Sequence, residues 1–410
     1  MKQLFRHPGV LLLFVLICFL IDFISDYYFG DQNGVIGKGR ISKLLFVCGV
    51  AAFWAWLVII GVMKKRIVFI QMAMVILLWG VLEVLGYIVL HVRERPIYFS
   101  RQELFEDDAN LGYKTRANFT ESKTEITSKG DTIYQIDFHS DRLGRRVNPF
   151  ENCGKFYGLF LGGSFTFGEG VKDNETLPIR FQEVLSDFYT YNYGFCGYGP
   201  HHMLALLQSR NLASEIDQRN GFGLYVYIDD HLRRVYGNMS KVTSFGRNAP
   251  HFGLDGDQLI RKGNFKNSRP YWIRKFLHVM HYSYVFQYLN IDWPLKIKEE
   301  HYLLTGRVID QMFLEYKAQF GNENFFVLIY PGESNKILSY IKQPEVKKLD
   351  YAHLFKRGEH TLHVLDEHPD TIAYKILADK LAEDLLITIP FFGEEHAETK
   401  GHPEKISPPN

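Results

Sequence analysis

The sequence predicts an α/β protein: a three-layer α/β/α domain around a parallel sheet, preceded by a small β-rich unit and three N-terminal transmembrane helices. Three observations lead to this fold class. Long apolar runs occupy the first quarter of the 410 residues, and a stretch of alternating apolar and polar residues follows them. From Lys155 onward, short apolar runs alternate with amphipathic stretches, which is typical of βαβ units in a parallel sheet.

The three apolar runs extend over about Val10–Phe29, Leu44–Met63 and Ile67–Leu90. Each is close to the roughly 20 residues that a helix needs to cross a bilayer. The first run also begins like a signal peptide, but no small-x-small cleavage pattern follows it. Three buried helices of a soluble core are the other alternative, and the short basic loops between the runs argue against it. We therefore expect residues 1–94 to form a multi-pass membrane anchor.

Basic residues near the spans indicate the orientation of this anchor. Lys2 and Arg6 precede the first span, and residues 64–66 (Lys-Lys-Arg) separate the second from the third. Both features place the N-terminus and the second loop in the cytoplasm. The basic residues that oppose this orientation are Lys38, Arg40, Lys43, Arg93 and Arg95. We expect the large C-terminal part to lie outside the cytoplasmic membrane of a bacterium.

The chain after the anchor divides into two parts. Residues 95–151 alternate apolar and polar side chains around a Lys-Gly-Asp turn, which predicts a β-rich unit with a hairpin. Residues 152–390 form the α/β domain, with strands at Phe156–Leu161 and Tyr191–Phe195 and a last helix at about Asp370–Leu386. The tail, residues 391–410, is polar and is expected to be disordered.

A basic and aromatic insertion interrupts the α/β domain at about residues 232–289. Between Arg233 and Lys275 it has ten Lys and Arg residues and only two acidic residues, Asp255 and Asp257. This composition suits an anionic glycan, through ion pairs and ring stacking, and equally suits the anionic head groups of a membrane. A solvated loop without a binding role is the plain alternative.

The overall composition argues against two classes of partner. The formal net charge is +1, which gives no support for a nucleic-acid partner. The histidines lack the paired Cys/His or Glu spacing that is typical of zinc sites. We therefore expect no metal and no cofactor.

Ser164 lies where a strand should end. In the sequence "LFLGGSFTFGEG", residues 159–170, an apolar run leads into two glycines and then the serine. Ligands of open parallel sheets bind at the carboxyl ends of the strands, and glycines allow a tight exit from a strand. The serine is therefore a candidate nucleophile, although an ordinary Ser/Gly-rich βα turn would have the same composition.

A serine nucleophile needs a base, and the base needs an orienting carboxylate. The segment "HVLDEHPD", residues 363–370, supplies both just before the last helix. His368 can reach the same edge of the sheet as Ser164, and Asp366 can hold the imidazole through Nδ1. Alternatively, Asp366 is a turn residue and His368 is solvated.

Together the two segments resemble blocks of the SGNH/GDSL hydrolase superfamily. A third segment, "YNYGFCGYGPHHM" at 191–203, resembles the second block of that family, with Gly197 as the glycine. The similarity covers about residues 155–388 and implies a flavodoxin-like α/β/α fold. It also implies a Ser164, His368 and Asp366 triad, with an oxyanion hole formed by the backbone N–H groups of Ser164 and Gly197.

The sequence departs from the family pattern at three places. The usual first-block Asp is Gly163, and the terminal pair is spaced Asp-x-His instead of Asp-x-x-His. The family's third block supplies an Asn to the oxyanion hole, and its likeliest counterpart here is Asp230. A carboxylate would repel an oxyanion. The third donor would then come from elsewhere, and the candidates, which are also candidates for substrate binding, are His231, Arg233 and Arg234.

The resemblance implies a serine esterase or O-acyltransferase that acts on acyl esters, and we expect these to be O-acetyl groups of an extracytoplasmic glycan. Hydrolysis and transfer share the acyl-enzyme and differ in the acceptor, so the sequence leaves both open. Two alternatives remain: a catalytically weak or inactive SGNH-like protein that binds glycan or scaffolds membrane-protein partners, and a lipid esterase. The expected partners are the lipid bilayer and the acylated substrate.

Overall fold

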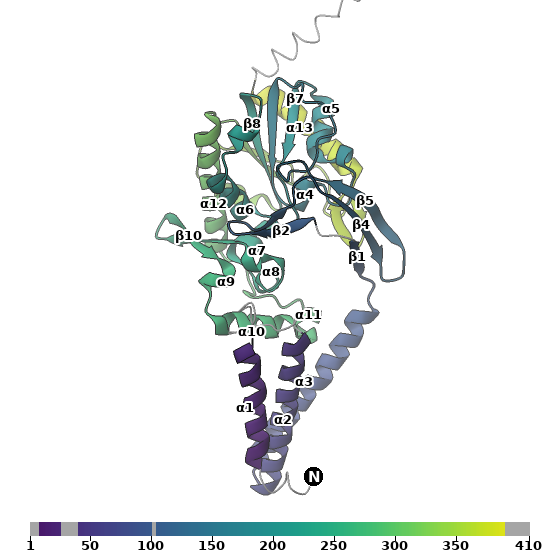
Figure 1. Ribbon diagram of the computed structural model, residues 1–410, viewed down its shortest axis with the longest axis vertical. Coiled ribbons are helices and arrows are strands. Elements are labelled where there is room, and N and C mark those ends of the chain that lie inside the picture. The colour runs from purple at the N-terminus through teal and green to yellow at the C-terminus, as the bar shows by residue number, and fades with distance from the viewer. Residues whose placement is uncertain (1–7, 26–39, 101–103, 390–410) are drawn as a thin grey trace, which may run out of the picture. The chain divides into compact units, whose positions relative to one another are not determined.

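The computed structural model describes residues 8–25, 40–100 and 104–389 (Figure 1). The predicted disordered tail and the first loop of the anchor lie outside these residues. The chain forms two compact units, which are described separately. The first unit contains residues 1–93, Gly237–Arg247 and Asn264–Ile297, and the second contains Glu94–Tyr236, Asn248–Gly263 and residues 298–410.

The first unit begins with three apolar helices: α1 (Pro8–Ile24), α2 (Arg40–Met63) and α3 (Ile67–Val92). Two of them, α3 and the Leu44–Met63 part of α2, are long and apolar enough to cross a membrane, whereas the apolar stretch of α1, Gly9–Asp22, is shorter. Many of their large apolar side chains are exposed. This exposure would be costly in water and is expected for helices in a lipid environment.

The apolar helices pack in antiparallel pairs. Phe19, near the end of α1, contacts Phe46, near the start of α2, with ring centroids 6.1 Å apart. Trp56, near the end of α2, contacts Phe69 at the start of α3 at 6.3 Å. The rest of this unit comes from the insertion and comprises the helices α8 (Met239–Val242), α9 (Phe265–Ser268), α10 (Tyr271–His281) and α11 (Tyr284–Tyr288).

The second unit contains the predicted parallel sheet. Its five strands are parallel and lie in the order β12-β11-β8-β6-β7. They are β6 (Phe156–Leu161), β7 (Phe188–Asn192), β8 (Asn220–Tyr227), β11 (Phe325–Ile329) and β12 (Lys347–Asp350). The chain proceeds from β6 to β7 on one side and then returns to β8 on the other, so β6 and β8 form the switch point of this open sheet, where ligands bind in such folds.

Helices cover both faces of the sheet (Figure 1). Alternate residues of β6 enter different cores because side chains of a strand point to opposite faces. Tyr157, Leu159 and Leu161 pack in one core with residues of α6 (Pro200–Ser209) and α12 (Glu299–Phe320). Phe156 and Phe160 pack in the other core with residues of α5 (Leu177–Val184) and α13 (Thr371–Thr388). The predicted α/β class with a parallel sheet is thus confirmed.

One predicted strand has different bounds. The expected strand Tyr191–Phe195 is β7, which ends at Asn192. The Asn192 side-chain oxygen accepts the backbone N–H of Gly194 at 3.0 Å, so the side chain closes a turn that ends the strand. Tyr193 to Phe195 then form part of the loop that leads to Gly197.

A smaller antiparallel sheet precedes the parallel one. Its order is β1-β4-β5, with β1 (Pro96–Ser100), β4 (Thr120–Thr127) and β5 (Thr132–His139), and the predicted Lys-Gly-Asp turn joins β4 to β5. A separate hairpin is formed by β2 (Phe105–Asp108) and β3 (Gly112–Thr115).

The remaining elements of the second unit are short. The helices α4 (Ser164–Phe167) and α7 (Asp230–Tyr236) follow β6 and β8. Two hairpins complete the unit, β9 (Pro250–Asp255) with β10 (Gln258–Asn264) and β13 (Thr361–His363) with β14 (Asp366–Pro369). Four short 3₁₀ helices, Asp173–Glu175, Leu212–Glu215, Phe245–Asn248 and Asn335–Ser339, lie in loops or at unit boundaries.

Candidate active site

Ser164 is the first residue of α4, directly beyond the carboxyl end of β6. The two glycines before it make the sharp exit from the strand. A Cβ atom on Gly163 would lie 2.8 Å from the carbonyl oxygen of Tyr198 and 3.0 Å from both Arg234 Nη1 and His231 Nε2. A side chain at this position would force the Tyr198 backbone to move, which is a physical reason for glycine here. The turn leaves Ser164 4% exposed.

The structure places Ser164, His368 and Asp366 in one hydrogen-bonded chain. His368 Nε2 lies 2.9 Å from Ser164 Oγ, and His368 Nδ1 lies 2.5 Å from Asp366 Oδ1. Both partners of the serine belong to the short strand β14. Because residues two apart in a strand share a face, the Asp-x-His spacing brings the carboxylate and the imidazole together. The same Asp366 oxygen also accepts the backbone N–H of His368 at 3.0 Å.

The charges around His368 favour its protonated form. Burial lowers the pKa of His368, but the carboxylates of Glu169 and Asp366 outweigh it, so the pKa lies above its ordinary value. Burial has the opposite effect on an acid and raises the pKa of Asp366. The hydrogen bonds and the charge of His368 nevertheless hold that pKa below its ordinary value. Asp366 is therefore ionised at neutral pH and stabilises an imidazolium, as the orienting acid of a triad does.

Glu169 is a further member of the site that the sequence reasoning missed. Its Oε2 lies 3.5 Å from His368 Nε2, and its Oε1 forms an ion pair with Lys123. Burial raises the pKa of Glu169, but the positive charges of His368 and Lys123 bring the pKa down to about 2. Glu169 thus adds a permanent negative charge beside the base. The residue is within the "FTFGEG" stretch, but no pattern there assigned it a role.

Glu125 is a second carboxyl group that the sequence reasoning missed. It is fully buried in β4, two residues after Lys123 and so on the same face of that strand. Burial raises the pKa of Glu125 to about 7, and the charge of Asp366 adds to this increase. Asp366 Oδ2 accepts no hydrogen bond from a donor in the described residues. A proton on Glu125 supplies that donor, so β4 supports both carboxylates next to His368.

A buried arginine fixes the loop that follows the nucleophile. The guanidinium of Arg146 donates to the carbonyl oxygens of Phe167 at 3.1 Å, Gly168 at 2.5 Å and Val171 at 2.6 Å. It also donates to Asp173 Oδ1 at 2.8 Å. These bonds satisfy backbone oxygens that helix α4, only four residues long, cannot satisfy itself.

Two backbone N–H groups are available for an oxyanion. The N–H groups of Ser164 and Gly197 donate to no acceptor among the residues that the structure describes. Gly197 has a positive φ of 78°, a conformation that glycine adopts without strain, and it directs the turn after β7.

The candidate residues that follow β8, within 230–234, lie in different environments. Asp230 pairs with Arg234 one turn further along α7, at 2.8 Å, and Arg234 also donates to the Tyr198 carbonyl at 2.5 Å. His231 is buried, with Nδ1 2.6 Å from the Tyr225 hydroxyl. Arg233 is exposed, and the structure describes no hydrogen bond or ion pair between it and Ser164, His368 or Asp366. The structure therefore brings His231 and Arg234 to the nucleophile turn and leaves Arg233 outside it.

The tautomer of His231 follows from its neighbours. The backbone N–H of Ile228 donates to Nδ1 at 3.4 Å, and the Tyr225 hydroxyl lies next to the same nitrogen. Nδ1 is thus the acceptor, and we assign the ring proton to Nε2, the nitrogen on the side of Gly163.

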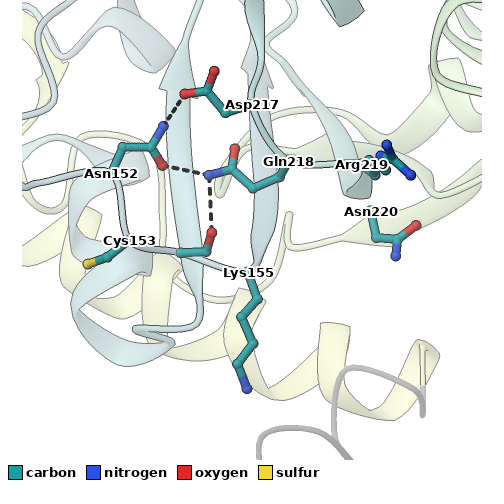
Figure 2. Close-up of a pocket in the computed structure, with 8 residues that line it drawn as sticks. Asn152, Cys153, Lys155, Asp217, Gln218, Arg219 and Asn220 are labelled. Atoms are coloured by element: carbon teal, nitrogen blue, oxygen red, sulfur yellow. Dashed lines mark hydrogen bonds between the residues drawn. The ribbon is translucent and has the colours of Figure 1, made fainter.

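A hollow of about 500 Å³ lies at the end of the sheet where the strands begin, opposite to Ser164 (Figure 2). It is formed by residues 152–155, just before β6, and by residues 217–220, which lead into the start of β8. Figure 2 shows that Asn152 bridges Asp217 and Gln218 by hydrogen bonds of 2.6 Å and 2.5 Å. Because these residues precede the strands, the hollow is at the amino ends and is separate from the Ser164 site. No group of three or more His, Cys, Asp or Glu in the described ranges is arranged to hold a metal ion.

Comparisons with known proteins give a weak structural likeness. No protein-family model matches the chain, and no curated protein matches it. Among solved structures, the chain is similar to an acetyl xylan esterase (Est2A) from the rumen bacterium Butyrivibrio proteoclasticus, with 13% sequence identity and a TM-score of 0.34. The similarity covers 68% of this chain and 72% of the other. A likeness this weak does not assign the chain to a family.

Proposed function

We propose that the chain is a membrane-anchored serine esterase or O-acyltransferase of the SGNH type. The observation that carries this proposal is the hydrogen-bonded chain from Ser164 Oγ to His368 to Asp366 at the carboxyl end of β6. A serine, an imidazole and a carboxylate in this order activate a hydroxyl for attack on an acyl carbon.

The reaction proceeds in two halves. His368 Nε2 takes the proton of Ser164 as Oγ attacks the carbonyl carbon of an acyl ester, and the same nitrogen then gives the proton to the departing alcohol oxygen. The acyl group is now esterified to Ser164. In the second half His368 takes a proton from water or from an acceptor hydroxyl, which attacks the acyl-enzyme, and returns it to Ser164 Oγ. Water gives hydrolysis and a hydroxyl gives transfer.

The oxyanion of each half needs hydrogen-bond donors. We assign two donors to the backbone N–H groups of Ser164 and Gly197. Asp230 cannot be the third, since it is a carboxylate paired with Arg234. His231 Nε2–H, on the side of Gly163, is the proposed replacement for the family's Asn. Loss of one such donor typically costs roughly 10²–10³-fold in rate.

The proposed location is the outer side of a bacterial cytoplasmic membrane, with α1, α2 and α3 as three spans. The antiparallel order of these helices and the exposure of their apolar side chains support the spans. The basic residues near the spans support the side of the membrane. The proposed substrate is an O-acetyl ester of an extracytoplasmic glycan. Its support is the resemblance in sequence together with the anchor.

The test is turnover of p-nitrophenyl acetate by the full-length protein in detergent. Ser164→Ala and His368→Ala should each lower kcat by at least roughly 10³-fold. The matched controls are Ser186→Ala and His353→Ala, which change exposed residues of the same types and should keep the wild-type rate. Folding of each variant is checked by circular dichroism.

Three results would replace this proposal. Absence of turnover by folded wild-type protein would favour the binding or scaffolding alternative. Turnover that survives in both active-site variants would exclude the serine mechanism. A strong preference for long-chain over acetyl esters would instead favour the lipid esterase.

A further inference from the structure

Helix α11, from the middle of the chain, packs on the apolar helix α3. The Glu83 carboxylate of α3 accepts the backbone N–H of Tyr284 at 2.7 Å and the hydroxyl of Ser283, so it caps the start of α11. The Tyr284 ring lies 5.1 Å from that of Tyr87, and Phe286 lies 5.6 Å from Trp79. α11 is therefore integrated with α3 by hydrogen bonds and by ring contacts.

The positions of these contacts along α3 give the depth of α11 in a bilayer. At about 1.5 Å per residue, Trp79 lies about 18 Å, and Arg93 about 39 Å, from the start of the helix at Ile67. The hydrocarbon core of a bilayer is about 30 Å thick. Contacts with α11 extend from Trp79 to Arg93, whose guanidinium lies over the Tyr288 ring at 5.3 Å. If α3 spans the membrane, α11 lies across the boundary between hydrocarbon and head groups.

Helix α10 has a similar attachment to α1. Lys275 of α10 forms an ion pair with Asp22, near the end of α1. Acidic residues within apolar membrane helices are costly unless they have partners. Both Asp22 and Glu83 receive partners from the insertion. Figure 1 shows α10 running crosswise to the apolar helices of its own unit, which is the direction of a helix in the plane of a membrane surface.

The exposed side chains of this segment suit a membrane interface. Trp272 and Phe276, four residues apart and so on one face of α10, are 69% and 58% exposed, and Trp293 is 54% exposed. Trp is enriched where hydrocarbon meets head groups. Within residues 237–247 and 264–297 the chain has one acidic residue, Asp292, and these basic residues: Lys241, Arg247, Lys266, Arg269, Arg274, Lys275 and Lys296. This charge favours anionic lipid.

We propose that residues 264–297 are a second, internal part of the membrane anchor, with α10 and α11 at the boundary between the hydrocarbon and the head groups of the bilayer that α2 and α3 cross. The occupant of the exposed Trp272 and Phe276 face is anionic lipid. This inference rests on the proposed membrane anchoring and is independent of the proposed chemistry.

The experiment measures where single side chains lie in proteoliposomes of phosphatidylethanolamine and phosphatidylglycerol. Full-length protein with its four cysteines changed to Ala receives one nitroxide label, at Trp272→Cys or Phe276→Cys. Leu78→Cys on α3 is the lipid control, and Val364→Cys, 85% exposed in the second unit, is the water control. Collisions with oxygen, which concentrates in lipid, are compared with collisions with a water-soluble nickel chelate.

The expected result is that labels at 272 and 276 collide several-fold more with oxygen than with nickel, as the label at 78 does. Preference for nickel at 272 and 276, with lipid behaviour at 78, would overturn the internal anchor and leave the N-terminal anchor intact. Protection from both reagents would indicate a protein contact and would also overturn it. Nickel access at 78 would refute membrane anchoring itself.

Discussion

Three carboxyl groups lie in and around the pair of His368 and Asp366, and their pKa values differ. Asp366 is ionised and hydrogen-bonded to Nδ1, whereas Glu169 is ionised with a pKa of about 2 near Nε2. Glu125, whose pKa is raised to about 7, is protonated at lower pH and donates to Asp366. The arrangement keeps negative charge on both sides of the imidazole without placing three like charges together.

Glu169→Gln should change the pH dependence of the proposed reaction. The charge of Glu169 raises the pKa of His368, and the acid limb of kcat/KM reports the pKa of the free base. Removal of this charge should move the limb to lower pH. The measurement is kcat/KM for p-nitrophenyl acetate between pH 4 and 9, with the exposed Glu183→Gln as control. An unmoved limb would show that Glu169 does not act on the base.

Glu125→Gln should change the pH dependence of stability. The folded-state pKa of Glu125, about 7, lies above the ordinary value of 4.5, so folded protein binds more protons between these values. The free energy of unfolding contributed by this group therefore falls as pH rises through that window. Gln cannot ionise, so the Tm of the variant relative to wild type should increase between pH 5 and pH 8. The exposed Glu106→Gln should show no such trend, and a constant difference for Glu125→Gln would contradict the assignment.

The sequence motifs identified Ser164, His368 and Asp366 but not the charged groups around them. Ser164, Asp366 and His368 lie in short motifs whose order resembles a family, so they could be named before the structure. Lys123 and Glu125 lie in a strand about 40 residues before the serine. The alternation in this segment predicted strands but not the element that either face would meet, because such pairing depends on the tertiary fold.

At the scale of elements, the turn between β6 and α4 has little room. Gly163→Ala would place a methyl group 2.8 Å from the Tyr198 carbonyl, so the backbone that holds Ser164 must move. We expect a loss of about 1–3 kcal/mol in unfolding free energy, together with a loss of activity. Urea unfolding and p-nitrophenyl acetate turnover measure both. Gly80→Ala, whose Cβ would meet no atom within 4 Å, should leave both unchanged. A stable and active Gly163→Ala would show that the turn is not constrained.

The elements themselves were predictable where periodicity was strong. The strand β6 and the last helix, α13, occur within a few residues of the expected positions. The end of β7 was set by a side-chain turn at Asn192, which a propensity argument does not resolve. The insertion was the least predictable part, because its amphipathic helices and its basic charge were compatible with glycan, lipid or solvent.

At the scale of the whole molecule, the first unit is assembled from segments that are distant in sequence. Asp22 and Glu83 are the partners of Lys275 and of the start of α11. A fragment that begins at Glu94 lacks both acidic residues and would expose the apolar surface of the insertion. We therefore expect this fragment to aggregate in buffer, or to sediment with phosphatidylglycerol vesicles, even though every predicted span is gone.

Centrifugation with and without vesicles measures this behaviour. The same fragment with Trp272→Ser, Phe276→Ser and Trp293→Ser should stay in the supernatant to a greater extent. If the fragment with all three aromatic residues intact is monodisperse and does not sediment with vesicles, the insertion does not need the N-terminal helices.

The chain passes between its two units five times, after Arg93, Tyr236, Arg247, Gly263 and Ile297. An ectodomain on a single stalk is shed into the medium by one proteolytic cut. In this protein, a cut between α3 and β1 would leave the second unit joined to the first through the other four crossings. On the proposed anchoring, the second unit would stay at the membrane. On the proposed function, such an enzyme is retained by the cell that made it, and only acyl groups that pass close to that cell's own surface are within its reach.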